Sequence, residues 1–189
     1  GDGGPGYLEV GKPHAGIRNS AVTISASPGW TYTSLQKSAD HTLFYLSGFN
    51  ATATKADETL TYSSDTPVMI DLVEIELTFG PAEGAIEIRI DDLQPVRRSL
   101  ISGQTERLVL RMSINDMHPL KTLQITTLNN SSVTVSSVGM FNTKAGLSLS
   151  RIGFPGATVD ILNRLEPNIL SDTLKRLAPH IVILAFGTN

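Results

Sequence analysis

The chain contains no cysteine in its 189 residues. Disulfide bonds, thiolate catalysis and cysteine-ligated metals are therefore excluded. No segment approaches the roughly 18 consecutive apolar residues that a membrane-spanning helix needs, and no signal peptide is visible. The absence of cysteine is compatible with export, and we expect a periplasmic or extracellular protein.

Charge of either sign is also scarce. Charged residues make up 17% of the chain, and the net charge is −3 with a pI near 5.8. This balance gives no reason to expect a nucleic acid or an anionic membrane surface as a partner. Hydrophobic residues make up 40%, which is ordinary for a soluble globular protein, and the length suits one or two domains.

Apolar and polar residues alternate through the middle of the chain. Val73, Ile75 and Leu77 point one way and Glu74 and Glu76 the other, which predicts a strand with one buried face. Strands are expected at 21–25, 30–33, 42–46, 51–55, 59–62, 73–79, 86–90, 108–114, 123–127 and 133–135. Their number and the turn residues between them indicate a mainly β protein with an antiparallel, jelly-roll-like β-sandwich over residues 19–145.

The pattern changes after residue 145. Ala157 opens an amphipathic helical run, which Pro167 is expected to end because proline lacks an N–H. Ser171 is a good N-cap for a second helix, which ends before Pro179. Residues 181–186 are an unbroken apolar run, which is typical of a strand buried on both faces in a parallel sheet. The segment 146–189 is therefore predicted to be α/β.

Two short motifs bracket this α/β segment. Pro-Gly-Ala-Thr at 155–158 precedes the first helix, and Gly-Thr-Asn at 187–189 follows the apolar run. Their spacing resembles the second and third blocks of the SGNH/GDSL hydrolase family, whose catalytic domain is flavodoxin-like. The resemblance implies an oxyanion hole to which Gly156 gives a backbone N–H and Asn189 a side-chain N–H₂. The alternative interpretation is an ordinary loop glycine and a turn at the end of a strand.

The other two blocks of that family are absent. Gly1-Asp2-Gly3 has glycine where the nucleophilic serine of Gly-Asp-Ser should stand. Asp116-Met117-His118 has the wrong spacing for Asp-x-x-His and is expected to be a surface turn. The resemblance therefore implies that the missing SGNH segments lie upstream and downstream in the same protein. This chain alone is predicted not to hydrolyse esters.

The N-terminal phrase Gly-Asp-Gly-Gly-Pro-Gly-Tyr resembles the segment that precedes the inserted β-domain of peptidoglycan O-acetylesterase-like members of the family. Residues 1–18 are accordingly expected to be a loop of the SGNH domain. Tyr7 and His14 are candidate substrate contacts, although such a tyrosine more often packs and such a histidine is more often solvated. Trp30 and Tyr32 would share a face that can stack on sugar rings, but the single tryptophan more often fills the core.

Two functions follow from these observations. One is a serine ester hydrolase that removes O-acetyl groups from a polysaccharide such as peptidoglycan, and the inserted sandwich favours this substrate over a lipid ester or a thioester. The other is a non-catalytic carbohydrate-binding or interaction module. Neither needs a cofactor, and the adjacent Asp91 and Asp92 are expected to form a turn rather than a metal site.

Overall fold

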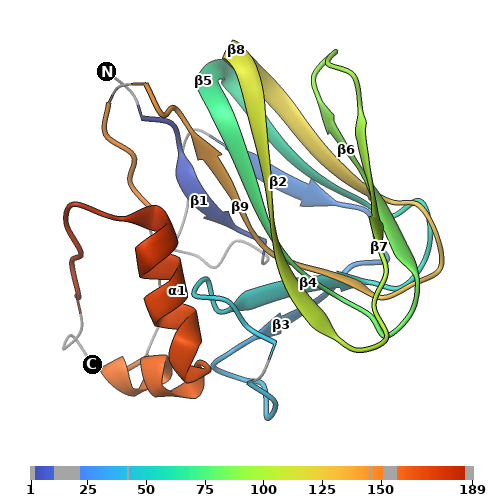
Figure 1. Ribbon diagram of the computed structural model, residues 1–189, viewed down its shortest axis with the longest axis vertical. Coiled ribbons are helices and arrows are strands. Elements are labelled where there is room, and N and C mark those ends of the chain that lie inside the picture. The colour runs from blue at the N-terminus through green and yellow to red at the C-terminus, as the bar shows by residue number, and fades with distance from the viewer. Residues whose placement is uncertain (1–2, 11–21, 42, 145, 151–156, 186–189) are drawn as a thin grey trace.

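The computed structural model describes residues 3–10, 22–41, 43–144, 146–150 and 157–185. These ranges contain nine strands, a short 3₁₀-helix η1 (Val159–Arg164) and one α-helix α1 (Pro167–Leu177). The strands are β1 (Gly6–Glu9), β2 (Thr23–Ala26), β3 (Thr31–Ser34), β4 (Phe49–Ala53), β5 (Thr59–Phe79), β6 (Gly84–Ile90), β7 (Val96–Leu100), β8 (Glu106–Thr127) and β9 (Val133–Phe141). The prediction of a mainly β chain is confirmed (Figure 1).

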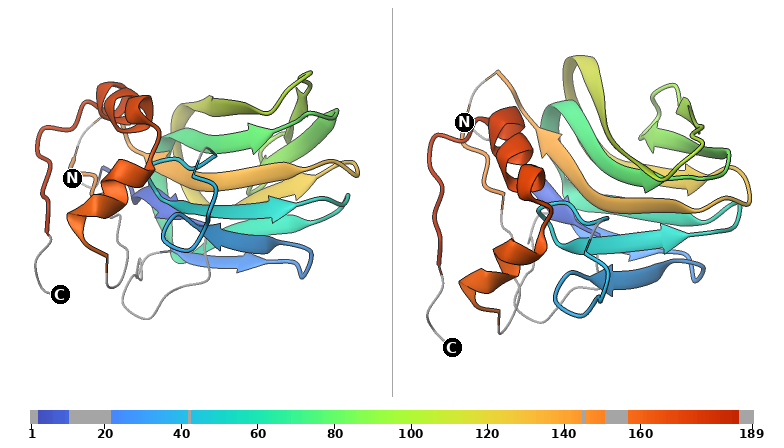
Figure 2. Two further views of the ribbon diagram at one scale, coloured as in Figure 1. Left: turned by 90° about the horizontal axis from the view of Figure 1, so that it is seen from below. Right: turned by 60° about the horizontal axis from the view of Figure 1, so that its bottom comes forward.

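All of the strand pairs are antiparallel. The sheet runs in the order β3-β4-β9-β5-β8-β6-β7, while β1 pairs with β9 and β2 pairs with β5. Figure 2 shows that the long strands curve, so the sheet curls over on itself with the helices to one side. The arrangement is consistent with the predicted sandwich.

Strands β5 and β8 make the curl possible. Each was predicted as two separate strands, but each is continuous, with register shifts between Ser63 and Val68 and between Ile70 and Leu72. Such irregularities bend a strand and increase its twist. The first part of β5 pairs with β2 and the last part with β9, so one strand contributes to both layers.

The core lies between the two layers. The predicted inward set Val73, Ile75 and Leu77 is fully buried, and Phe79 is 7% exposed. Facing them are other apolar side chains with little or no exposure, among them Leu60, Ile86, Ile88, Leu123, Ile125, Val135 and Val138. Each such side chain stabilises the fold by about 1.5–3 kcal/mol through burial.

Two predictions of loop and strand along the chain were wrong. The loop predicted for 1–18 contains β1, which pairs with β9. Gly4 and Gly6 take positive φ angles of 86° and 73°, which lets the chain approach neighbouring backbone closely there. Residues 43–46, within the strand predicted for 42–46, form turns in which Phe44 and Tyr45 are buried.

Strand β7 and the segment at His118 also differ from expectation. No strand was predicted at β7, whose central residues Arg97 to Ser99 are all exposed and therefore show no alternation. The turn predicted at 116–118 belongs to β8, where it falls at the register shift opposite Ile70 and Leu72.

The helical segment begins and ends differently from expectation. The first run is a six-residue 3₁₀-helix, and Pro167 stands in the first turn of α1 instead of only ending the preceding helix. Proline is tolerated there because first-turn N–H groups have no partner within the helix. Ser171 consequently lies inside α1 rather than at its N-cap. Neither helix is long and apolar enough to cross a membrane, within the ranges described.

The buried strand predicted at 181–186 is not formed over the described residues 181–185. The side chains of Ile181, Val182, Ile183 and Leu184 are 78%, 56%, 80% and 68% exposed. A strand needs a neighbour that pairs with its backbone groups, and the described sheet does not extend to this segment. Figure 1 shows it running beside α1, on the side away from the sheet.

Candidate functional site

Of the predicted site residues, the structure describes Tyr7, Trp30 and Tyr32. Gly156, Asn189 and His14 lie outside the described residues, so their proposed roles stay predictions. Trp30 is 4% exposed and belongs to the main core cluster, which agrees with the interpretation that it packs. Tyr32 is partly buried against the same cluster. Of the three described candidates, Tyr7 alone stands among charged groups.

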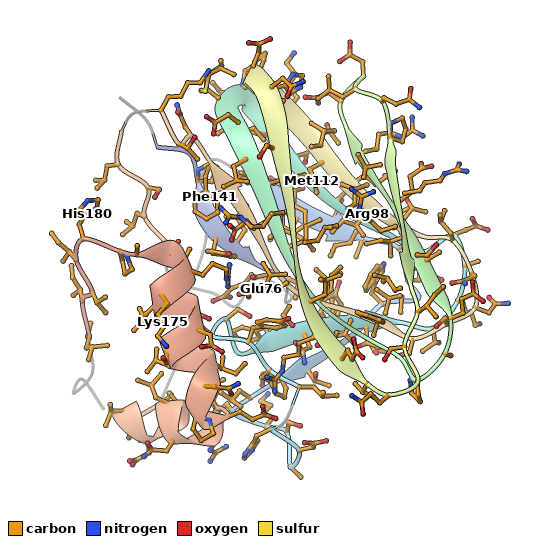
Figure 3. All side chains as sticks on the ribbon, viewed as in Figure 1. Glu76, Arg98, Met112, Phe141, Lys175 and His180 are labelled. Carbon is orange, nitrogen blue, oxygen red and sulfur yellow. The ribbon has the colours of Figure 1, made fainter. Side chains whose placement is uncertain are left out.

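Tyr7 belongs to a buried polar cluster that joins four distant parts of the chain. The Arg176 cluster, as we call it, comprises Tyr7 on β1, Glu74 and Glu76 on β5, Ser137 on β9 and Arg176 on α1. Figure 3 shows Glu76 in the space between the sheet and the helix. The glutamates were predicted to face solvent, yet both are only 2% exposed, because α1 covers this face of the sheet.

Arg176 makes the central contacts of the cluster. One guanidinium nitrogen, Nη1, donates to Glu74 Oε2 at 2.5 Å and also to the Tyr7 hydroxyl, and Nη2 donates to Glu76 Oε1 at 2.5 Å. The Ser137 hydroxyl donates to the other oxygen of Glu76 at 2.5 Å. The guanidinium therefore bridges two carboxylates with charge-assisted hydrogen bonds.

The remaining acceptors of Glu74 are also occupied. The Tyr7 hydroxyl donates to Glu74 Oε2, and Arg111 Nε lies 2.8 Å from Glu74 Oε1. The Tyr7 ring makes an edge contact with Phe141 at 5.3 Å, and the guanidinium lies 5.4 Å from the centre of the Tyr7 ring. With all four carboxylate oxygens bonded, the geometry suits positioning of α1 against the sheet better than acid–base chemistry.

The electrostatics of the cluster follow from its burial. Burial raises the pKa of Glu76 above its ordinary value, and the Ser137 hydroxyl and Arg176 offset this only in part. Burial, with the hydrogen bond to Glu74, raises the pKa of Tyr7, so the phenol stays protonated. Burial by itself would lower the pKa of Arg176, but Tyr7 and the two glutamates outweigh it and raise the pKa.

The raised pKa of Glu76 predicts a pH dependence of stability. Above the ordinary glutamate pKa of 4.5, the folded state still binds a proton that the unfolded chain has released. We therefore expect this contribution to the free energy of unfolding to be present at low pH and lost as pH rises through the raised pKa. In Glu76→Gln the fall should be smaller. Urea unfolding at a series of pH values from about 4 to 8 measures both slopes.

Glu87→Gln is the matched control for that experiment. Hydrogen bonds from Arg97 and Arg89 hold the pKa of Glu87 below its ordinary value. Its contribution to stability is therefore present above the ordinary pKa and lost as pH falls, which is the opposite sign. Equal slopes in the wild type and in Glu76→Gln would contradict the assignment.

A contact between an acid and a histidine lies away from the cluster. Asp91, in the predicted turn, has a positive φ of 44°. Its carboxylate lies 2.8 Å from His118 Nε2 and accepts the backbone N–H of Thr122 at 2.7 Å. These two contacts hold the turn at Asp91 against β8. Among the described residues, no group of three or more potential metal ligands comes together.

Comparison with known proteins gives a likeness at the level of structure. No protein-family model and no curated protein matches the sequence. A solved peptidoglycan O-acetylesterase is similar over 90% of this chain, with a TM-score of 0.64 and 19% identity, and the chain spans 43% of that protein's length. This chain, a curled antiparallel sheet followed by two short helices, therefore shares its fold with part of that esterase.

Two further solved structures are similar in part. A carbohydrate-binding module from Clostridium stercorarium, in complex with cellobiose, is 10% identical with a TM-score of 0.45, over 72% of this chain and 93% of the module. A family two carbohydrate esterase from Cellvibrio japonicus is 15% identical with a TM-score of 0.39, over 69% of this chain and 36% of the esterase.

Proposed function

We propose that this chain is part of an SGNH-type serine ester hydrolase, exported from the cytoplasm, that removes O-acetyl groups from a polysaccharide such as peptidoglycan. Support comes from the motifs at 155–158 and 187–189 and from the likeness to a peptidoglycan O-acetylesterase, which extends over 90% of the chain. In this proposal residues 1–18 and 146–189 belong to the catalytic domain and residues 19–145 form the inserted sandwich.

The observation that carries the proposal is the exposed apolar run after α1. Four consecutive large apolar side chains, from Ile181 to Leu184, are between 56% and 80% exposed. Exposed apolar surface of this kind marks a site of interaction. A parallel sheet would bury such a run on both faces, and the strands of that sheet would come from the missing SGNH segments. Pairing of residues 181–184 with those strands would bring Asn189, which follows shortly after in the chain, to the edge of the sheet. The sites of α/β proteins are built at that edge.

The reaction then uses residues inside and outside this chain. A serine upstream attacks the acetyl carbonyl carbon, and a downstream histidine takes the serine proton and passes it to the leaving sugar oxygen. The Gly156 N–H and the Asn189 side-chain amide stabilise the oxyanion that forms. Water then releases acetate from the serine by the same steps.

The alternative of a non-catalytic glycan-binding module is less well supported. Carbohydrate-binding modules commonly present exposed aromatic faces on which sugar rings stack. Among the described residues, no aromatic side chain is fully exposed, and Tyr7, Tyr32 and Phe141 are half-buried. Tyr7 is moreover engaged by Glu74 and Arg176.

Two observations test the proposal. The gene around this chain should encode Gly-Asp-Ser before position 1 and Asp-x-x-His within a few hundred residues after position 189. A gene without these motifs would contradict the esterase proposal and favour the non-catalytic binding module. In the protein that contains these blocks, loss of the Asn189 amide should remove most of the deacetylation rate.

A further inference from the structure

A polar pocket lies where the segment after β3 meets η1. It is lined by Gln36, Ala157, Thr158, Asp160, Ile161 and Arg164, and its volume is about 170 Å³. It is thus built jointly by the sandwich and by the helical segment. The space holds several water molecules but falls below the roughly 300–1,000 Å³ of sites for drug-sized ligands.

Two opposite charges line the pocket without neutralising each other. Asp160 and Arg164 stand four residues apart in the 3₁₀-helix η1, and no salt bridge joins them in the described chain. Arg164 is held from the other side, where its Nη1 donates to the carbonyl oxygens of Gln36 at 2.9 Å and Leu35 at 3.5 Å. Thr158 donates its hydroxyl to Asp160 Oδ2 at 3.3 Å.

This arrangement suits a neutral ligand rich in hydroxyl groups. A carboxylate accepts hydrogen bonds from hydroxyls, and the Nε and Nη2 groups of a guanidinium donate to hydroxyl or ring oxygens. An anionic ligand would meet the charge of Asp160, and a cationic ligand that of Arg164. The apolar Ile161 and Ala157 offer contact to C–H groups. With this volume, the pocket fits a single sugar ring.

Covalent geometry ties the pocket to the proposed oxyanion hole. Ala157 lines the pocket and follows Gly156 directly in the chain. Standard bond lengths hold the Gly156 nitrogen within about 5 Å of the Ala157 Cα atom in any conformation. A sugar in the pocket would therefore contact a residue that is covalently joined to Gly156, the residue proposed to give its N–H to the oxyanion.

We propose that the pocket is a subsite for one neutral sugar unit of the acetylated polysaccharide, with Asp160 and Arg164 as its hydrogen-bonding groups. The identity of the polymer as substrate rests on the proposed esterase function. Binding of a sugar to the pocket does not, and it is measurable on this chain without any catalysis.

Titration of the chain with chitotetraose, the neutral tetrasaccharide of N-acetylglucosamine, tests the subsite. We expect shifts in the backbone amide NMR signals of residues 157–164, and an Asp160→Ala variant should weaken binding about tenfold or more, because a hydrogen bond to a charged group is lost. Asp172→Ala is the matched control, since Asp172 is an exposed carboxylate on α1 outside the pocket. The control should bind as the wild type does.

Three results would overturn the subsite: no shifts at residues 157–164, equal affinity in the wild type and Asp160→Ala, or tighter binding of the anionic tetragalacturonate than of chitotetraose. In the complete enzyme, Asp160→Ala should raise KM for acetylated polymer while kcat stays near the wild-type value. If Asn189→Ala keeps full activity, the esterase proposal fails while the chitotetraose result still decides the subsite.

Discussion

Replacement of Asn189 by alanine in the complete enzyme is expected to lower kcat about 10²–10³-fold and to leave KM nearly unchanged. The side-chain amide is proposed to donate to the oxyanion, whose charge develops only as the serine attacks. Its loss therefore raises the energy of the transition state but not that of the bound substrate. Initial rates of acetate release from O-acetylated peptidoglycan measure both constants.

The charge of the replacement and its position provide the controls. Asn189→Asp should be at least as harmful as Asn189→Ala, since it places a negative charge beside the forming oxyanion. Asn168→Ala removes the same amide from an exposed position on α1 and should leave both constants at the wild-type values. Full activity in Asn189→Ala would contradict the proposal that this chain is part of an SGNH-type esterase.

Replacement of Arg176 by methionine is expected to lower the free energy of unfolding by about 3–5 kcal/mol, because Glu74 and Glu76 would stay buried without their shared cation. For a domain of this size the melting temperature should fall by about 6–20 °C. Calorimetry or circular dichroism measures this shift. Arg176→Lys should recover part of the loss, but a single ammonium cannot bond both carboxylates as the planar fork does.

Two further variants separate this effect from a general loss of positive charge. Lys175→Met removes an exposed cation from the next position of α1 and should change stability by less than about 0.5 kcal/mol. Glu74→Gln combined with Glu76→Gln in the Arg176→Met background should restore part of the stability, since no buried charge is then unpaired. A melting temperature unchanged in Arg176→Met would show that the cluster does not hold the helix.

Local patterns predicted the sandwich because most of its core strands carry their own evidence of a buried face. The alternation around Ile75 and that around Ile88 both indicate strands, and both residues lie in the core. These patterns did not predict that β5 and β8 are each one continuous strand, because the alternation breaks where their pairing is irregular. Strand β1 was missed because its glycines favour turns, and their use here depends on contact with residues far along the chain.

The candidate functional residues likewise fall into two groups: those that the sequence predicted and those that only the fold brings together. The motifs that contain Gly156 and Asn189 are local and were visible in the sequence, although those two residues lie outside the described part of the chain. The Arg176 cluster unites residues that stand roughly a hundred positions apart, and no local pattern reports such pairing. A Glu-x-Glu pair within a strand normally indicates a solvated face, and only a helix packed on that face reverses the inference.

The pairing of β1 with β9 has a consequence for synthesis on the ribosome. Tyr7 leaves the ribosome about 130 residues before its partner Gly139, a delay on the order of ten seconds at ordinary translation rates. During that interval β4 and β5 also lack β9, which pairs with both. Until β9 emerges, the nascent chain therefore exposes strand edges that can pair with other chains. Because the sheet closes late in translation, the incomplete chain is more prone to pair with other chains than the finished one.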